Sequence, residues 1–131
     1  MAYTAAVTFD QPHPVKDKSG DWGWMSGTVN ITEYNSTLVE ITDITKHFKV
    51  VKRVVTELSD ECYAFYWNST DSAFDAYNIQ TTLTADTSGN ALTYTGGALH
   101  ATGGGTVDMT RAEATDATDV GAANFIVYGT L

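Results

Sequence analysis

The residue types that most often carry enzyme chemistry occur in this chain without the spacing that such chemistry needs. The histidines, His13, His47 and His100, form no His-x-His or His-Glu-x-x-His pattern, and we interpret them as polar surface residues. No Gly-x-Ser-x-Gly pattern marks a serine nucleophile. The single cysteine, Cys62, can neither form a disulfide within its own chain nor hold zinc alone. We therefore predict no catalytic residue, no metal or cofactor site and no enzymatic activity.

One acidic segment, 108–119, has side chains that could offer oxygen ligands to a calcium ion. Its carboxylates lack the Asp-x-Asp-x-Asp-Gly spacing of a defined calcium loop. They are Asp108, Glu113, Asp116 and Asp119. We interpret the segment as a solvated acidic loop with one short helical turn, and the sequence leaves its cation binding undecided.

Large aromatic side chains give a stronger signal for binding, and two of them stand close together in Trp22-Gly23-Trp24-Met25. Side chains two residues apart on a strand point to the same face, so Trp22 and Trp24 share one face. The pair could belong to the core, anchor a subunit contact, where Trp is enriched, or stack on sugar rings. The sequence favours core or interface over sugar and leaves the choice between those two open.

A second group of rings lies in the segment 62–78, CYAFYWNSTDSAFDAYN, on both faces of a predicted hairpin. One face can pack inward and carries Tyr63, Phe65 and Trp67. The other face carries Tyr66 and Tyr77, and it needs a partner of its own, either another sheet or another subunit. The predicted interface residues are accordingly Trp22, Trp24, Met25, Tyr66 and Tyr77.

The elements that position these residues are predicted to be strands, because short runs of alternating residues are separated by polar turns. The strongest runs are 3–9, 22–34, 49–58, 63–67, 73–78 and 124–131. Only 37–48 has an apolar spacing that also suits a helix, and we predict one helical turn near 43–47 with Asp43 as its N-cap. About eight short strands predict an all-β fold, a β-sandwich or jelly roll with at most one or two short helical turns.

The length of 131 residues predicts a single β-rich domain over 1–131. Within it, 1–21 contains two prolines and is predicted to form an extended N-terminal arm, and the Gly- and Thr-rich residues 80–115 are predicted to be an insertion. With 43% hydrophobic and 18% charged residues, the composition is typical neither of a disordered chain nor of a membrane protein. The first residues show no secretory signal, so we expect the protein to be used without secretion.

The net charge of −9 and the pI near 4.4 make the chain a poor partner for nucleic acid, because phosphate backbones reward Lys and Arg. Although the net charge is negative, four basic residues cluster within eight positions: Lys46, Lys49, Lys52 and Arg53. We interpret the cluster as a solvated, positively charged strand face, and it is the one place where an anionic partner could bind.

Several segments together resemble those of small virion proteins of tailed phages, of the capsid decoration or cement type. They are MAYTAAVTFDQPHPV, SGTVNITEYNS, FKVVKRVV, YAFYWNSTDSAFDAYN and DVGAANFIVYGTL. The resemblance covers 1–80 and 116–131 and does not extend to the residues between them. The resemblance is based on the residue pattern of the strands rather than on catalytic motifs, so no functional residue of that family is assigned to this chain.

The resemblance implies a non-enzymatic protein that binds the outer surface of the assembled phage head and stabilises contacts between major capsid subunits. It further implies a homotrimer that is made in the host cytoplasm and resides on the capsid exterior, with no nucleic-acid or membrane partner. The alternative is a carbohydrate- or receptor-binding β-sandwich module of a phage fibre, which Trp22, Trp24 and the outward tyrosines would suit.

Overall fold

Antiparallel strands are the main secondary structure of the described residues. The computed structural model describes residues 2–78, 82–85, 92–95, 98–101, 107–110 and 112–131. Contacts within the backbone divide the chain into two compact units, Met1–Asn78 with Glu113–Leu131, and Ile79–Ala112. The prediction of an all-β fold with very little helix is confirmed. No helix among the described residues is long and apolar enough to cross a membrane.

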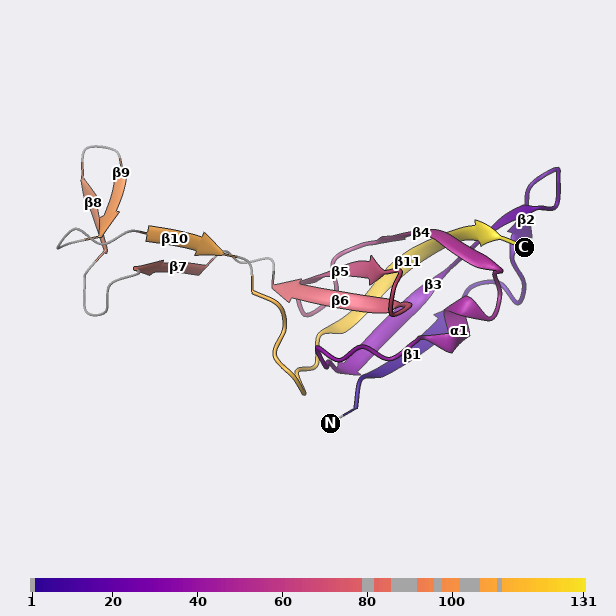
Figure 1. Cartoon of the computed structure of the whole chain (residues 1–131), viewed down its shortest axis with the longest axis horizontal. Coiled ribbons are helices and arrows are strands. Elements are labelled where there is room, and N and C mark those ends of the chain that lie inside the picture. Colours follow the sequence, from indigo (N-terminus) through magenta and orange to yellow (C-terminus); the bar gives the residue numbers. More distant parts are fainter. Residues whose placement is uncertain (1, 79–81, 86–91, 96–97, 102–106, 111) are drawn as a thin grey trace. The chain divides into compact units, whose positions relative to one another are not determined.

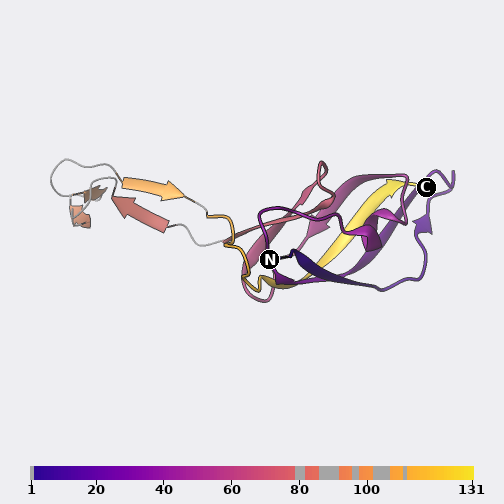
Figure 2. The ribbon, with the colours of Figure 1, turned by 60° about the horizontal axis from the view of Figure 1, so that its bottom comes forward.

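The first unit contains a five-stranded sheet in the order β1-β3-β11-β4, with the short β2 also paired to β3, and a separate β5–β6 hairpin. Its strands are β1 (Thr4–Phe9), β2 (Val15–Lys16), β3 (Trp22–Glu33), β4 (Val50–Thr56), β5 (Tyr63–Asn68), β6 (Ala73–Asn78) and β11 (Gly121–Thr130). Figures 1 and 2 show the long β11, in yellow, running beside β3 through the middle of this sheet. The sequence pattern missed β2, which lies inside the segment expected to be an arm.

Buried and outward-facing residues alternate along the two central strands of this sheet, β3 and β11. The buried set includes Met25, Val29, Ile31, Phe125 and Val127. Because successive side chains on a strand point to opposite faces, one face of the sheet is apolar and must be covered.

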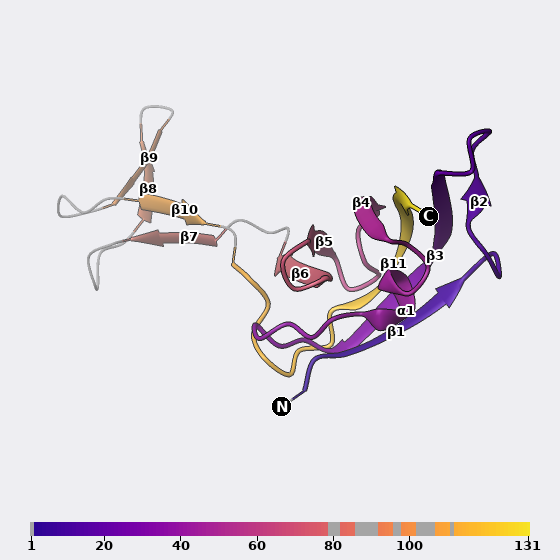
Figure 3. The same ribbon diagram turned by 45° about the vertical axis from the view of Figure 1, so that its right-hand side comes forward.

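The β5–β6 hairpin covers that inner face, as Figures 1 and 3 show. Phe74 of β6 has no exposed surface, and its ring lies 6.3 Å from the ring of Phe125 in the sheet. The same ring lies 5.1 Å from Trp67 and 6.0 Å from Phe65, both on β5. Aromatic pairs at these distances stabilise a core beyond the area that they bury. Sheet and hairpin are therefore the two layers of a small sandwich.

Gly27 in β3 makes one of the closest contacts of the core possible. It lies between Phe9 of β1 and Phe125 of β11 in the strand register. Because Gly27 has no side chain, the rings of Phe9 and Phe125 meet across it, 5.7 Å apart. A Cβ atom at this position would lie 2.3 Å from the Thr8 carbonyl oxygen, which belongs to the backbone and cannot move aside cheaply.

A short helix, α1 (Thr42–Thr45), adds Ile44 to the inner face of the sheet. The prediction that Asp43 caps this helix is wrong. The N-cap position is occupied by Ile41, with no side-chain hydrogen bond, and Asp43 lies in the first turn instead. There its carboxylate forms a salt bridge of 3.0 Å with Lys46, one turn later. Packing of Ile44, rather than capping, therefore holds this turn, since so short a helix has little stability of its own.

The segment 112–120 returns the chain to the sheet before β11. Backbone hydrogen bonds join Tyr34 to Thr118 and to Ala117, and the Tyr34 hydroxyl donates to the Glu113 carboxylate. The amide of Ser36 donates to Asp116, and the amide of Gly121 donates to Asp119. This part of the predicted acidic loop is thus an ordered connection, in which the carboxylates of Glu113, Asp116 and Asp119 accept hydrogen bonds from other groups of the protein.

The second unit consists of two antiparallel strand pairs, β7 (Thr82–Ala85) with β10 (Val107–Thr110) and β8 (Leu92–Thr95) with β9 (Ala98–Ala101). Val107 opposes Ala85, and Thr110 opposes Thr82. Asp108 therefore lies on a strand, and the prediction of a loop beginning at this residue is wrong. The residues Ser88-Gly89-Asn90 are typical of a turn, and this predicted turn lies outside the described residues.

We expect Phe74→Ala to lower the free energy of unfolding by about 3–5 kcal/mol, because it removes a fully buried ring and leaves a cavity between the two layers. Urea denaturation followed by circular dichroism measures this change. Tyr66→Ala, on the outward side of the same hairpin, is the matched control and is expected to cost about 1 kcal/mol or less. Equal losses in the two variants would show that the hairpin does not form the second layer.

We expect alkaline pH to destabilise the first unit through Tyr3. Its hydroxyl donates to the Phe74 carbonyl and accepts from the Phe74 amide at 3.1 and 3.2 Å. Burial raises the pKa of Tyr3 above the ordinary value of 10.0. Above pH 10 the unfolded chain loses this proton while the folded chain keeps it, so the folded state binds more protons and stability falls as pH rises.

The check is Tyr3→Phe, measured by denaturation between pH 7 and 11. At pH 7 this variant is expected to lose about 1–3 kcal/mol, because the buried amide and carbonyl of Phe74 lose their partner. Its further loss above pH 10 should be smaller than that of the unchanged protein. An identical alkaline slope in both proteins would contradict the assignment of the pH dependence to Tyr3.

Candidate functional site

The outer face of the five-stranded sheet is the strongest candidate site, because several of its large apolar side chains are exposed. Three of its aromatic side chains are substantially exposed: Trp22 by 46%, Trp24 by 37% and Tyr128 by 41%. Exposed aliphatic residues continue the apolar surface: Val15, Val50, Val55 and Ile126. We call these seven residues the open face. Exposed apolar patches on a folded protein mark binding surfaces when they are contiguous.

The strand register makes this surface contiguous. Trp24 opposes Tyr128 on one side and Val15 on the other, so side chains from β2, β3 and β11 form one row. Ile126 opposes Val55 in the adjacent row, on β11 and β4. Directly opposed side chains on neighbouring strands lie about 4.5–5.5 Å apart at Cβ, which is contact distance for rings and branched side chains.

A shallow hollow of about 200 Å³ lies at the aromatic end of the open face. It is lined by Trp22, Trp24 and Tyr128, with Lys16 and Asp17 at its border. Asp17 is committed to its own turn, because its carboxylate accepts from the Ser19 hydroxyl and the Gly20 amide. The hydrogen bond from Ser19 lowers the pKa of Asp17. The hollow therefore offers mainly aromatic surface to a ligand, because the carboxylate of Asp17 is already hydrogen-bonded within its own turn.

The other half of the outer sheet surface is polar, and its side chains bond to one another. Ser26 donates to Asp10 at 2.7 Å and accepts from Gln11 at 3.1 Å. Asn124 accepts from Thr28 at 3.0 Å and donates to Glu57 at 3.2 Å. A second hollow of about 440 Å³ is lined by Asp10, Ser26, Glu57 and Asn124 among others. Because the polar groups already have partners, the apolar half carries most of the capacity for new contacts.

The predicted interface residues divide among three environments. Trp22 and Trp24 share the outer surface of β3, as their spacing predicts. Met25 has no exposed surface and belongs to the core, because it points to the opposite side of the strand from its neighbour Trp24. Tyr66 and Tyr77 lie on the β5–β6 hairpin, where their rings pack edge to face with centroids 5.7 Å apart.

Tyr128, Ile126 and Val55 belong to the open face but were not predicted. Alternation alone could have assigned Tyr128 and Ile126 to the outward side of their strand. What no single strand reveals is that β11 pairs with β3 in the register that sets Tyr128 beside Trp24.

Within the described part of the chain, no group of three or more His, Cys, Asp or Glu residues could hold a metal ion. His47 is half-buried rather than exposed, and its ring packs on Phe9 with centroids 5.1 Å apart. Burial lowers the pKa of His47. Cys62 is free and exposed, and the side chain of His100 lies outside what the structure describes.

Comparisons with protein-family models, with curated proteins and with solved structures give no match for this chain.

Proposed function

We propose that this protein is a non-enzymatic capsid decoration protein of a tailed phage, which docks on the outer surface of the assembled head. The observation that carries the proposal is the open face, an exposed row of Trp22, Trp24 and Tyr128 on a sheet whose other face is already packed. Trp and Tyr are enriched among the residues that dominate protein–protein binding energy. The partner is the major capsid protein, and the role is to stabilise contacts between neighbouring capsid subunits.

The apolar character of the open face supports a protein partner over a sugar. The polar side chains beside it, Ser26 and Asn124 among them, already bond to protein groups and have less to offer sugar hydroxyls. A homotrimer would present three such faces at once, and avidity would then convert weak individual contacts into stable attachment. Attachment that spans two capsid subunits also explains a preference for the assembled shell.

We expect the double variant Trp24→Ala/Tyr128→Ala to bind assembled shells at least about tenfold more weakly, because it removes two central rings from the contact. Cosedimentation with shells of the phage that encodes the protein measures this loss. The control is Val39→Ala, which truncates an apolar side chain that is 55% exposed outside the open face. Light scattering of the free protein should give three times the chain mass of 14.1 kDa.

Binding to free capsid subunits as tightly as to shells would contradict decoration, and so would full binding by the double variant. Circular dichroism of each variant separates a loss of contact from a loss of fold.

The second candidate function is a carbohydrate-binding module of a phage fibre, which the hollow between Trp22, Trp24 and Tyr128 favours. Small-molecule sites combine apolar and aromatic surface with a few polar groups, and Lys16 and Asp17 border this hollow. In this case Trp22→Ala or Trp24→Ala should abolish binding on a glycan array, whereas Tyr66→Ala, an exposed ring elsewhere, should not. An array without a single bound glycan would remove this candidate.

A further inference from the structure

A second surface runs along β4 at the end of the sheet and shares Val50 and Val55 with the open face. The described strand ladders pair β4 with β11 alone, so its other edge carries no strand. A hollow of about 580 Å³ is lined by Val50 and Val51, and one of about 540 Å³ is lined by the rest of β4, from Lys52 to Thr56. Trp67 and Ser69 line both hollows, which therefore adjoin each other. We call these two adjoining hollows the β4 groove.

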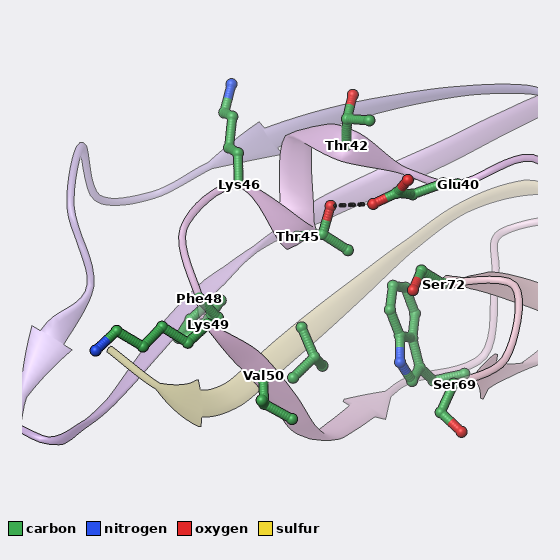
Figure 4. A pocket seen from close by; sticks show the side chains of 11 residues that line it. Glu40, Thr42, Thr45, Lys46, Phe48, Lys49, Val50, Ser69 and Ser72 are labelled. Carbon is green, nitrogen blue, oxygen red and sulfur yellow. Dashed lines mark hydrogen bonds between the residues drawn. The ribbon is translucent and has the colours of Figure 1, made fainter.

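The groove has the length and the chemistry of a site for an extended chain. At about 3.3 Å per residue, the seven residues of β4 span roughly 23 Å. The half-buried Trp67 and the exposed Tyr66 contribute aromatic surface from β5, across from the strand edge. Figure 4 shows the first hollow, with Ser69 and Ser72 on one side and α1 with Thr42 and Thr45 on the other.

The charge of the groove is opposite to that of the whole protein. Lys46, Lys49, Lys52 and Arg53 all line it, and they are four of the seven basic residues in a chain of net charge −9. Within the described residues, Lys46 is paired with Asp43, while the side chains of Lys49, Lys52 and Arg53 make no salt bridge. Figure 4 shows Lys46 and Lys49 extending outward from the hollow. Glu40 is the acidic residue among those that line it, and it accepts from the Thr45 hydroxyl at 2.8 Å.

We propose that the β4 groove binds an extended acidic peptide segment of a partner protein by strand addition to the free edge of β4. Main-chain hydrogen bonds to a sheet edge supply affinity in this mode, and pockets for alternate side chains supply specificity. The lysines and Arg53 select for acidic side chains on the incoming strand. They also repel the same edge of a second copy, which disfavours edge-to-edge pairing of two copies.

The charged edge has a simpler use, which is to prevent aggregation, since lysines and bulges on edge strands discourage unwanted pairing. β4 does carry a register irregularity opposite Tyr128 and Gly129, next to Lys52. This use accounts for the lysines but not for the side chain of Trp67, which lines both hollows of the groove. A single-stranded nucleic acid would use cations and rings but not the strand edge, and the remaining charge of the protein repels it.

The test measures fluorescence anisotropy of a labelled nine-residue peptide of alternating glutamate and valine, added to the full-length protein. A lysine–valine peptide controls for charge, and the acidic peptide with N-methyl groups on alternate backbone nitrogens controls for strand pairing. Binding of the acidic peptide is expected to exceed that of either control by at least about tenfold. A ten-nucleotide oligothymidylate provides the nucleic-acid arm and is expected not to bind.

Lys49→Glu/Lys52→Glu should weaken binding of the acidic peptide by about tenfold or more, because it reverses two charges in the groove. Lys16→Glu/Lys18→Glu makes the same change of charge elsewhere and should alter binding less than twofold. Equal weakening in both double variants, equal binding of the methylated peptide, or tighter binding of the oligothymidylate would each overturn the proposal. The methylated-peptide comparison uses the unchanged protein, so it decides the matter even where a variant fails to fold.

Discussion

The contact between Phe74 and Phe125 is the interaction on which the rest of the structure depends. It joins the β5–β6 hairpin to the middle of the sheet, and Trp67 and Phe65 extend it on the hairpin side. Because this contact is made on one face only, the two faces of the sheet differ: the hairpin packs on the inner face, and large apolar side chains of the outer face stay exposed. A small sandwich with one long central strand pair can therefore bury its apolar residues and still present Trp22, Trp24 and Tyr128 to the outside.

The same arrangement explains why the molecule offers two surfaces of different character. The hairpin lies over the sheet without extending it, so β4 is left at the end of the strand order with a free edge. The outward face of the sheet is apolar at one end and internally bonded at the other, which suits a broad protein contact. The edge of β4 is narrow, cationic and lined by rings from β5, which suits an extended chain.

Alternation predicted a good part of this from the residues alone. The assignments of Tyr63, Phe65 and Trp67 to the inward side of the hairpin, and of Tyr66 to the outward side, depend only on the geometry of an extended strand. The capping role expected for Asp43 failed for a different reason. Ile44 is pulled into the core, and this tertiary contact sets where the turn begins, overriding the local preference of an acidic residue for the N-cap.

By itself the sequence determined the fold class, the approximate position of most strands of the first unit, and the shared face of Trp22 and Trp24. These follow from interactions between residues close in the chain. Only the tertiary structure decided that β11 lies between β3 and β4, and hence that Tyr128 joins the tryptophans while Met25 does not. It alone also decided that the cluster from Lys46 to Arg53 borders a groove rather than a plain strand face. Strand order and register are set by how all apolar faces pack together at once, and no local pattern carries that information.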